Sequence, residues 1–199
     1  VLFYHTWLDI NKSNPTNWIN YEKQAQRMWE CTVSKVNLAY SNDSSNIRII
    51  NLPVSGALVD LVEKIVAGEM PGFTDSSTSA RLDKIFSDNV HNTNVGQYYI
   101  ALLNYIGLYG VKPTSSTLPS GNLSLLNNSG VLNALIDHAW NYLHNYYTTG
   151  SRTHTMSQCR SYATSFCSSY VTYGGNYTQQ NCVNAINDKF SNTMPTWFS

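Results

Sequence analysis

The sequence predicts an all-α fold: a single domain, residues 1–199, built as a bundle of about seven helices that ends in a disulfide-linked αα-hairpin. Three observations lead to this prediction. Apolar residues recur at steps of three and four along most of the chain, which is the spacing of one helix face. Caps, glycines and prolines separate these stretches. Four cysteines fall where packed helical segments can be linked.

The first helix is expected over residues 15–40. Asn14 and Pro15 provide a cap and a first-turn proline, and apolar side chains then recur at helical spacing as far as Val36. A short apolar run over 47–52 predicts a strand. The later apolar stretches, most of them closed by a glycine or a turn, predict helices at 55–68, 76–90, 94–109, 129–149, 155–171 and 178–190.

The helix at 94–109 is apolar nearly all round, which is typical either of a central core helix or of a membrane span. About 15 residues are fewer than the roughly 20 that a bilayer requires, and Gln97 and Asn104 interrupt the apolar surface. We therefore expect a core helix and no transmembrane span. Residues 111–128 are rich in Pro, Ser, Thr and Gly. They are expected to cross the surface, with a linker or a lid as alternatives, and they hold the candidate boundary within the domain.

Four cysteines without a CxxC pair predict two disulfides rather than a zinc site or a thioredoxin-like motif. Cys159 and Cys167 fall in one expected helix, where eight residues separate them by roughly 12 Å, so they cannot bond to each other. The turn at 174–175 lies midway between Cys167 and Cys182, and an antiparallel hairpin would bring those two level. The predicted pairs are Cys167 with Cys182 and Cys31 with Cys159.

The cysteines and the glycosylation sequons both indicate a secreted or cell-surface protein. The chain opens at Val1 without a positively charged leader, so we expect that a signal peptide has been removed. In a chain this rich in Asn, Ser and Thr, some sequons arise by chance, and the two within 122–127 are the strongest candidates. The sequons that are not blocked by a following proline are at Asn11, Asn42, Asn122, Asn127 and Asn176.

The net charge is zero, with 12 acidic and 12 basic residues, about half the usual share of charged side chains. A chain without net charge has no strong long-range attraction for nucleic acid or for an anionic membrane, and we expect no nucleic-acid partner. The small number of carboxylates also predicts that stability depends weakly on pH. Neutral polar groups are expected to form the wet surface, since Asn, Ser and Thr number 23, 23 and 17.

The sequence lacks the strong short motifs of catalysis and cofactor binding: GxSxG, HExxH, GxGxxG, a Walker loop and an EF-hand loop. The best catalytic group is Asp137 with His138 and His144. Six residues turn a helix through about 600°, which puts the two histidines about 120° apart and prevents them from sharing one metal. We expect no metal, no cofactor and no enzymatic activity.

A second pair of carboxylates, Asp60 and Glu63, lies at a spacing of three residues on the expected second helix. Such a pair can perform acid and base catalysis. However, Lys64 offers Asp60 an ion pair at a spacing of four residues. A solvated helix face is therefore the expected role of these residues.

Tyrosine is unusually frequent, with 14 residues, and those in the last third of the chain are a candidate interface or ligand site. A Tyr side chain supplies apolar area and one hydroxyl, which suits a half-buried contact that uses no charge. A Tyr-rich core is the alternative. The candidate residues are Tyr142, Tyr146, Tyr147, Tyr170, Tyr173 and Tyr177.

These features predict an extracellular structural or coat protein that associates with copies of itself through a neutral, Tyr- and Asn-rich surface. A surface without net charge lacks the repulsion that keeps proteins apart. One alternative is a secreted helical carrier that encloses a lipid or another apolar ligand, for which excess apolar volume between helices is needed. The other is a hydrolase of unrecognised type, which needs convergent carboxylates in a cleft.

Overall fold

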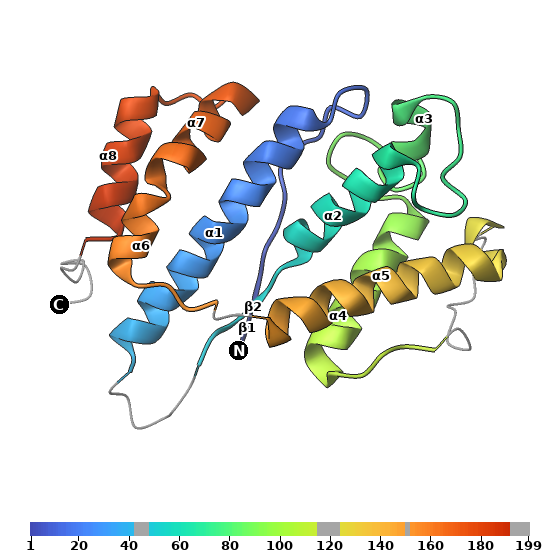
Figure 1. Cartoon of the computed structure of the whole chain (residues 1–199), viewed down its shortest axis with the longest axis horizontal. Coiled ribbons are helices and arrows are strands. Elements are labelled where there is room, and N and C mark those ends of the chain that lie inside the picture. The colour runs from blue at the N-terminus through green and yellow to red at the C-terminus, as the bar shows by residue number, and fades with distance from the viewer. Residues whose placement is uncertain (42–47, 115–123, 150–151, 192–199) are drawn as a thin grey trace.

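A computed structural model describes residues 1–41, 48–114, 124–149 and 152–191, and it is mostly helical, as predicted. Figure 1 shows the long helix α1 running through the middle of the molecule, with α6, α7 and α8 on one side and α2, α4 and α5 on the other. The helices are α1 (Thr16–Ala39), α2 (Val54–Ala67), α3 (Thr78–Leu82), α4 (Asn94–Tyr109), α5 (Ser129–Thr148), α6 (Met156–Ser161), α7 (Ala163–Tyr173) and α8 (Gln179–Lys189), with a short 3-10 helix η2 (Ser124–Asn127) before α5.

Several of the main helices begin or end at a capping residue, whereas α1 begins after Pro15 without a side-chain cap, so the cap expected at Asn14 is wrong. The Thr93 side chain caps α4 and that of Asn128 caps α5 by accepting hydrogen bonds from backbone N–H groups of the first turn. Gly68 and Gly110 end α2 and α4 in the left-handed conformation, which a residue without a Cβ adopts at little cost. Local sequence signals therefore determine the bounds of these helices.

The predicted helix at 76–90 is wrong in its second half, because α3 ends at Leu82. The Asp88 carboxylate accepts hydrogen bonds from the N–H groups of Val90 and His91, which turns the chain back on itself. Phe86 then forms a short antiparallel bridge with Asn92. An aspartate that bonds its own downstream backbone competes with helix formation, and the apolar spacing alone does not reveal this.

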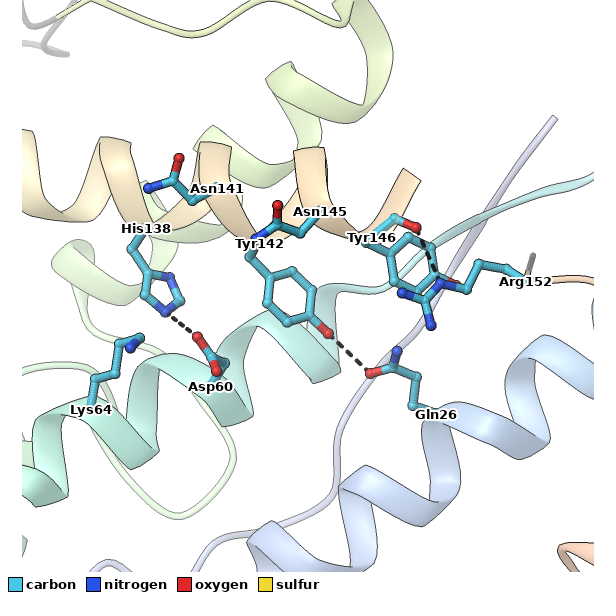
Figure 2. Close-up of a pocket in the computed structure, with 9 residues that line it drawn as sticks. All are labelled: Gln26, Asp60, Lys64, His138, Asn141, Tyr142, Asn145, Tyr146 and Arg152. Atoms are coloured by element: carbon cyan, nitrogen blue, oxygen red, sulfur yellow. Dashed lines mark hydrogen bonds and ion pairs between the residues drawn. The ribbon is translucent and has the colours of Figure 1, made fainter. Parts of the chain in front are cut away.

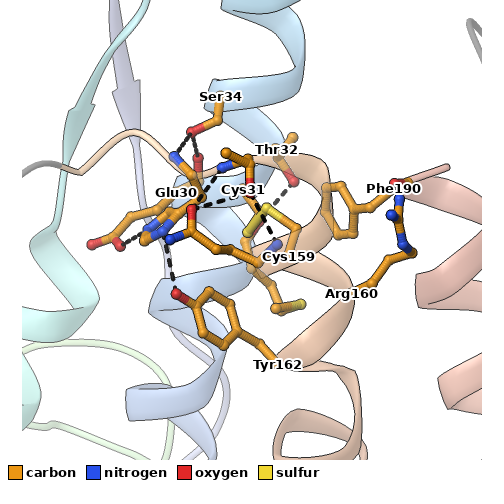
Figure 3. Close-up of a disulfide and its surroundings, with 12 residues drawn as sticks. Glu30, Cys31, Thr32, Ser34, Cys159, Arg160, Tyr162 and Phe190 are labelled. Carbon is orange, nitrogen blue, oxygen red and sulfur yellow. Dashed lines mark hydrogen bonds and ion pairs between the residues drawn. A yellow bond between two sulfur atoms is a disulfide. The ribbon is translucent and has the colours of Figure 1, made fainter. Parts of the chain in front are cut away.

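The predicted helix at 155–171 is divided at Tyr162 into α6 and α7. The break lies between two cysteines with different partners, since Cys159 on α6 bonds to α1 and Cys167 on α7 bonds to α8. Both predicted disulfides are present, with Cα–Cα distances of 5.6 Å and 5.7 Å, and the C-terminal hairpin of α7 and α8 is confirmed. Figure 3 shows the Cys31–Cys159 disulfide between α1 and α6.

Two short strands, β1 (Leu2–Tyr4) and β2 (Ile50–Leu52), pair in parallel. The described part of the strand predicted over 47–52 corresponds to β2, whereas the sequence analysis did not predict β1. Leu2 lies opposite Ile50 and Tyr4 opposite Leu52. This pairing leads directly into α2, so it positions the first turn of that helix beside α1.

The buried apolar residues that the structure describes form two clusters. The larger one surrounds α2, which is buried on nearly every side over its first half, and joins it to α4 and α5. The smaller one lies around the Cys31–Cys159 disulfide and contains Met28, Met156 and Phe190. Among the described residues, no helix combines the length and the apolar character that a membrane span requires.

Candidate functional site

A polar pocket of about 440 Å³ lies between α1, α2 and α5. This volume falls within the range of about 300–1,000 Å³ that is typical of sites for small molecules. Figure 2 shows the pocket with Asp60, Lys64 and His138 toward one end and Tyr146 and Arg152 toward the other. Every residue of its lining carries a polar group: Gln26, Asp60, Lys64, His138, Asn141, Tyr142, Asn145, Tyr146 and Arg152.

Helix α5 supplies most of the pocket wall. Its lining residues recur at steps of three and four, so they form one stripe along the helix. The stripe is polar, and it borders the apolar stripe with which the same helix faces the main core. Its members are His138, Asn141, Tyr142, Asn145 and Tyr146.

Helix α2 supplies the opposite wall through Asp60 and Lys64, and Gly56 lies one turn before Asp60 on the same face. A Cβ at Gly56 would collide with the side-chain oxygens of Gln26 and Tyr142. The Tyr142 hydroxyl donates a hydrogen bond to Gln26 Oε1 over 3.0 Å. The absence of a side chain at Gly56 therefore allows α1 and α5 to meet across α2.

Asp60 and His138 form a hydrogen-bonded pair at one end of the pocket. His138 Nε2 lies 2.8 Å from Asp60 Oδ2, and His138 Nδ1 lies 2.7 Å from the buried hydroxyl of Tyr99 on α4. The hydrogen bond from His138 lowers the pKa of Asp60, and Lys64 and Lys23 lower it further. The Asp60 carboxylate is thus ionised at neutral pH. The Tyr99 hydroxyl also donates to the Ala57 carbonyl oxygen of α2, 3.1 Å away.

Both ring nitrogens of His138 are therefore engaged within the protein. The ring joins α2, α4 and α5, and its side chain is only 5% exposed, against 43% for Asp60. A histidine in this position fixes the orientation of the Asp60 carboxylate, and it has no free nitrogen with which to act as a base on a substrate. The pair thus presents a fixed, partly exposed carboxylate to the pocket.

At the other end, the Arg152 guanidinium lies over the ring of Tyr146 at 4.4 Å, and Arg152 Nε donates to the Tyr146 carbonyl oxygen. A cation over an aromatic face is attracted by the negative face of the ring. Gln26 Nε2 donates to the buried carboxylate of Glu30 on α1 over 3.2 Å. This end of the pocket therefore meets a second polar group of residues within the protein.

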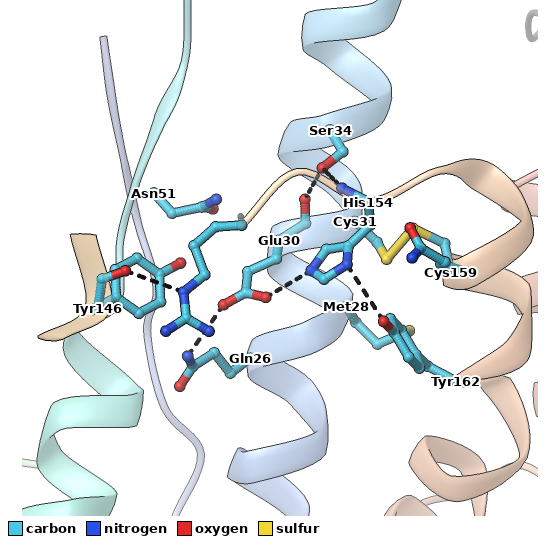
Figure 4. A network of polar contacts seen from close by, with 12 residues as sticks. Gln26, Met28, Glu30, Cys31, Ser34, Asn51, Tyr146, His154, Cys159 and Tyr162 are labelled. Carbon is cyan, nitrogen blue, oxygen red and sulfur yellow. Dashed lines mark hydrogen bonds and ion pairs between the residues drawn. A yellow bond between two sulfur atoms is a disulfide. The ribbon is translucent and has the colours of Figure 1, made fainter. Parts of the chain in front are cut away.

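Figure 4 shows this second group, which is centred on Glu30. Glu30 Oε2 lies 2.8 Å from His154 Nε2, and both side chains are nearly buried, at 4% and 13% exposure. The backbone N–H of His154 donates to Ser34 Oγ, which in turn donates to the Glu30 carbonyl oxygen. These contacts hold the chain that follows Arg152 against α1, next to the Cys31–Cys159 disulfide.

The catalytic group considered from the sequence does not converge. Asp137 pairs with Lys112 at 2.7 Å on the surface, while His138 turns inward to Asp60. His144 stacks on Trp140 with the two ring centroids 5.5 Å apart. Within the described ranges, no three His, Cys, Asp or Glu side chains are grouped so that they could hold a metal ion.

The expected ion pair between Asp60 and Lys64 is replaced by other contacts. Lys64 lies 3.7 Å from Glu69, and Glu63 pairs with Lys23 of α1 at 2.6 Å. Asp60 is instead half-buried against His138, which is 78 residues away in the sequence. No local pattern in the sequence connects the two residues, so sequence spacing does not predict this pairing.

The six candidate tyrosines divide into two sets instead of forming one surface. Tyr142 and Tyr146 line the pocket, and Tyr147 donates from its hydroxyl to the Asn51 carbonyl oxygen. Tyr170 and Tyr173 pack with Tyr21 of α1. Two of the six are exposed: Tyr147 at 42% and Tyr177 at 59%.

Three of the five sequons lie on described residues, and the side chains of Asn11, Asn127 and Asn176 are all exposed. An attached glycan requires such exposure. Asn42 and Asn122 lie outside the described residues, as does half of the loop expected over 111–128. Glycosylation stays a prediction at each of the five positions.

No family model matches this chain, and neither a curated protein nor a solved structure matches it. The site is therefore interpreted from its own geometry. In the sequence, the signal for this site is the polar stripe of α5. Only Tyr142 and Tyr146 of this stripe were predicted as candidate site residues.

Proposed function

We propose that this chain is an extracellular binding protein for a small polar ligand, which it holds in the pocket between α1, α2 and α5. The observation that carries the proposal is the lining: each of the nine side chains around about 440 Å³ is polar, and none is aliphatic. Its amides, hydroxyls and opposite charges at fixed positions favour a ligand with several hydrogen-bonding groups.

The polar lining disfavours a carrier of lipid or another apolar ligand, because burying an apolar molecule there would leave polar groups without partners. Self-association through a tyrosine surface has less support than the pocket, since four of the six candidate tyrosines are half-buried or buried. The extracellular location is supported by the two disulfides, which persist in oxidising compartments.

A thermal-shift screen tests the proposal with small polar compounds, namely saccharides, polyols, amino acids and nucleosides, and with fatty acids as the apolar set. A ligand that binds only the folded state raises the melting temperature by mass action. We expect stabilisation by at least one polar compound and by none of the fatty acids.

Asn141→Ala combined with Asn145→Ala is expected to abolish this stabilisation. Asn133→Ala is the matched control, because Asn133 is an exposed asparagine of the same helix that does not line the pocket. Stabilisation by fatty acids alone, or a polar ligand whose effect survives the double substitution, would refute the proposed pocket.

A further inference from the structure

One end of the pocket presents a carboxylate oxygen without a partner among the described residues. His138 holds Asp60 Oδ2 at 2.8 Å, whereas no hydrogen bond of the described residues involves Asp60 Oδ1. The Asp60 side chain is 43% exposed and lines the pocket. No lysine or arginine of the described ranges forms an ion pair with Asp60, and the nearby Lys64 lies 3.7 Å from Glu69 instead. Asp60 Oδ1 is therefore open to a cationic group of a ligand.

The other end of the pocket presents a guanidinium group without a carboxylate partner. Arg152 Nε donates to the Tyr146 carbonyl oxygen over 3.1 Å, but within the described ranges Arg152 forms no ion pair and its two Nη groups have no hydrogen-bond acceptor. The nearby Glu30 is directed to His154 at 2.8 Å and does not line the pocket. The N–H groups of Nη1 and Nη2 thus remain, and such a fork binds both oxygens of a carboxylate.

The two charged groups stand at a separation that a short peptide spans. Figure 2 shows Asp60 and Arg152 at opposite ends of the pocket. Asp60 contacts His138 and Arg152 contacts Tyr146, and these two contact residues lie eight positions apart on α5. At 1.5 Å of helix rise per residue, the ends are separated by about 12 Å. A hydrogen bond at each end takes up about 3 Å. The remaining distance of about 6 Å is the length of roughly two extended residues.

Between the two ends, the α5 wall presents amide groups. Asn141 and Asn145 lie one helical turn apart and are exposed, and their side-chain amides have no hydrogen-bond partner among the described residues. Each amide offers a carbonyl acceptor and an NH₂ donor. A peptide group offers the matching N–H and C=O. A neutral polar molecule would match this wall equally well, but it would leave both charged ends without a partner.

We propose that the ligand is a peptide of two or three residues with free termini, whose ammonium group binds Asp60 and whose terminal carboxylate binds Arg152. This inference rests on the proposed function and names the class of ligand for the same pocket. It assigns Asp60 and Arg152 as specificity-determining residues, each for one terminus. Asn141 and Asn145 then bind the peptide backbone between them.

Isothermal titration calorimetry with the full chain tests the ligand class. The probes are dialanine, trialanine, diserine and triserine, each also with an acetylated N-terminus or an amidated C-terminus, and the single amino acids alanine and serine. We expect at least one free peptide to bind. Blocking either terminus removes a charge-assisted hydrogen bond, so each blocked form is expected to bind at least about tenfold more weakly. The single amino acids are too short to reach both ends and are expected to bind more weakly by a similar factor.

Asp60→Asn and Arg152→Gln test the two contacts. Asp60→Asn is expected to bind the free and the acetylated peptide equally, and Arg152→Gln the free and the amidated peptide equally. A merely structural loss would instead weaken all forms by the same factor. Asp137→Asn and Arg27→Gln are the matched controls and should keep the wild-type preferences. Asp137 is an exposed aspartate of α5 outside the pocket, and the Arg27 guanidinium lies 5.4 Å from the ring centre of Tyr162, also outside it.

The outcomes separate this inference from the proposed function. If a blocked terminus leaves the affinity unchanged, or the corresponding variant keeps the preference for the free terminus, the contact assigned to that terminus is overturned. If no peptide binds while another polar compound does, and its binding requires Asn141 and Asn145, the peptide class is overturned and the polar-ligand pocket stands. If no polar compound binds in the pocket, the inference falls together with the proposed function.

Discussion

Glu22 on α1 is a buried carboxylate, and its replacement by glutamine is expected to stabilise the protein above neutral pH. The side chain is 1% exposed, and its Oε1 accepts a hydrogen bond of 2.7 Å from the Leu8 N–H. Within the described residues, none of the salt bridges involves Glu22. Burial therefore dominates, and it raises the pKa of Glu22 from 4.5 to about 7 despite the opposing hydrogen bond.

The direction of the effect follows from proton linkage. Between pH 4.5 and about 7 the folded protein holds a proton on Glu22 that the unfolded chain has released. The stabilisation is complete below pH 4.5, and it is lost as the pH rises through that window, by about 1.4 kcal/mol for each pH unit. The whole difference is roughly 3 kcal/mol, which is large against the total stability of a domain and larger than the weak pH dependence expected from the small number of carboxylates.

Urea unfolding at pH 5, 6, 7 and 8, with the disulfides intact, measures this effect. Glu22→Gln keeps an acceptor for the Leu8 N–H and cannot ionise. We expect it to match the wild type within about 1 kcal/mol at pH 5 and to exceed it by up to roughly 3 kcal/mol at pH 8. Glu69→Gln, at an exposed glutamate, is the control and is expected to leave the pH profile unchanged. If the free energy of unfolding depends on pH in the same way for the wild type and Glu22→Gln, the raised pKa of Glu22 is refuted.

Three further predictions concern the pocket and the surface. Gly56→Ala is expected to destabilise the chain by about 1–3 kcal/mol in urea unfolding, because the new Cβ meets Gln26 and Tyr142; an unchanged midpoint would contradict the close approach. The lowered pKa of Asp60 gives stability that is present at neutral pH and lost below about pH 3.8. Asp60→Asn should thus cost at most about 1 kcal/mol at pH 7 and less at pH 3, and an equal cost at both would contradict the ionised pair. If copies associate through the exposed tyrosines, sedimentation of the chain should show assembly at low and high salt, and Tyr147→Ser with Tyr177→Ser should weaken it. A wild-type chain that is monomeric at all concentrations would exclude this association.

The features that the sequence predicts correctly are local ones. The apolar spacing and the caps of α2, α4 and α5 lie within single stretches of chain, and so do the signals for their ends. The disulfides were predictable because helix geometry excludes a bond between Cys159 and Cys167, and the turn after α7 pairs Cys167 with Cys182. Where a side chain bonds its own backbone, as Asp88 does, the same spacing predicts a helix that does not form.

The pocket depends on contacts between distant segments, which sequence spacing does not reveal. Asp60 and His138 are 78 residues apart, and Glu30 and His154 are 124 residues apart. One signal was available, since Glu22 follows Trp18 by one helical turn on the face that α1 buries. A charged residue within an apolar stripe predicts a buried carboxylate, but its pKa depends on the surrounding burial.

The most direct measurement of the central claim is an NMR titration that follows the side-chain NH₂ signals of Gln26, Asn141 and Asn145, with the saccharides, polyols, amino acids and nucleosides of the thermal-shift screen as the probes. These three amides line the pocket, and Asn133 on the same helix lies outside it. The account predicts saturable shifts of all three pocket amides with one common affinity, and no shift of Asn133. Signals that stay in place at high concentrations of every polar compound, or shifts confined to amides outside the pocket, would contradict it.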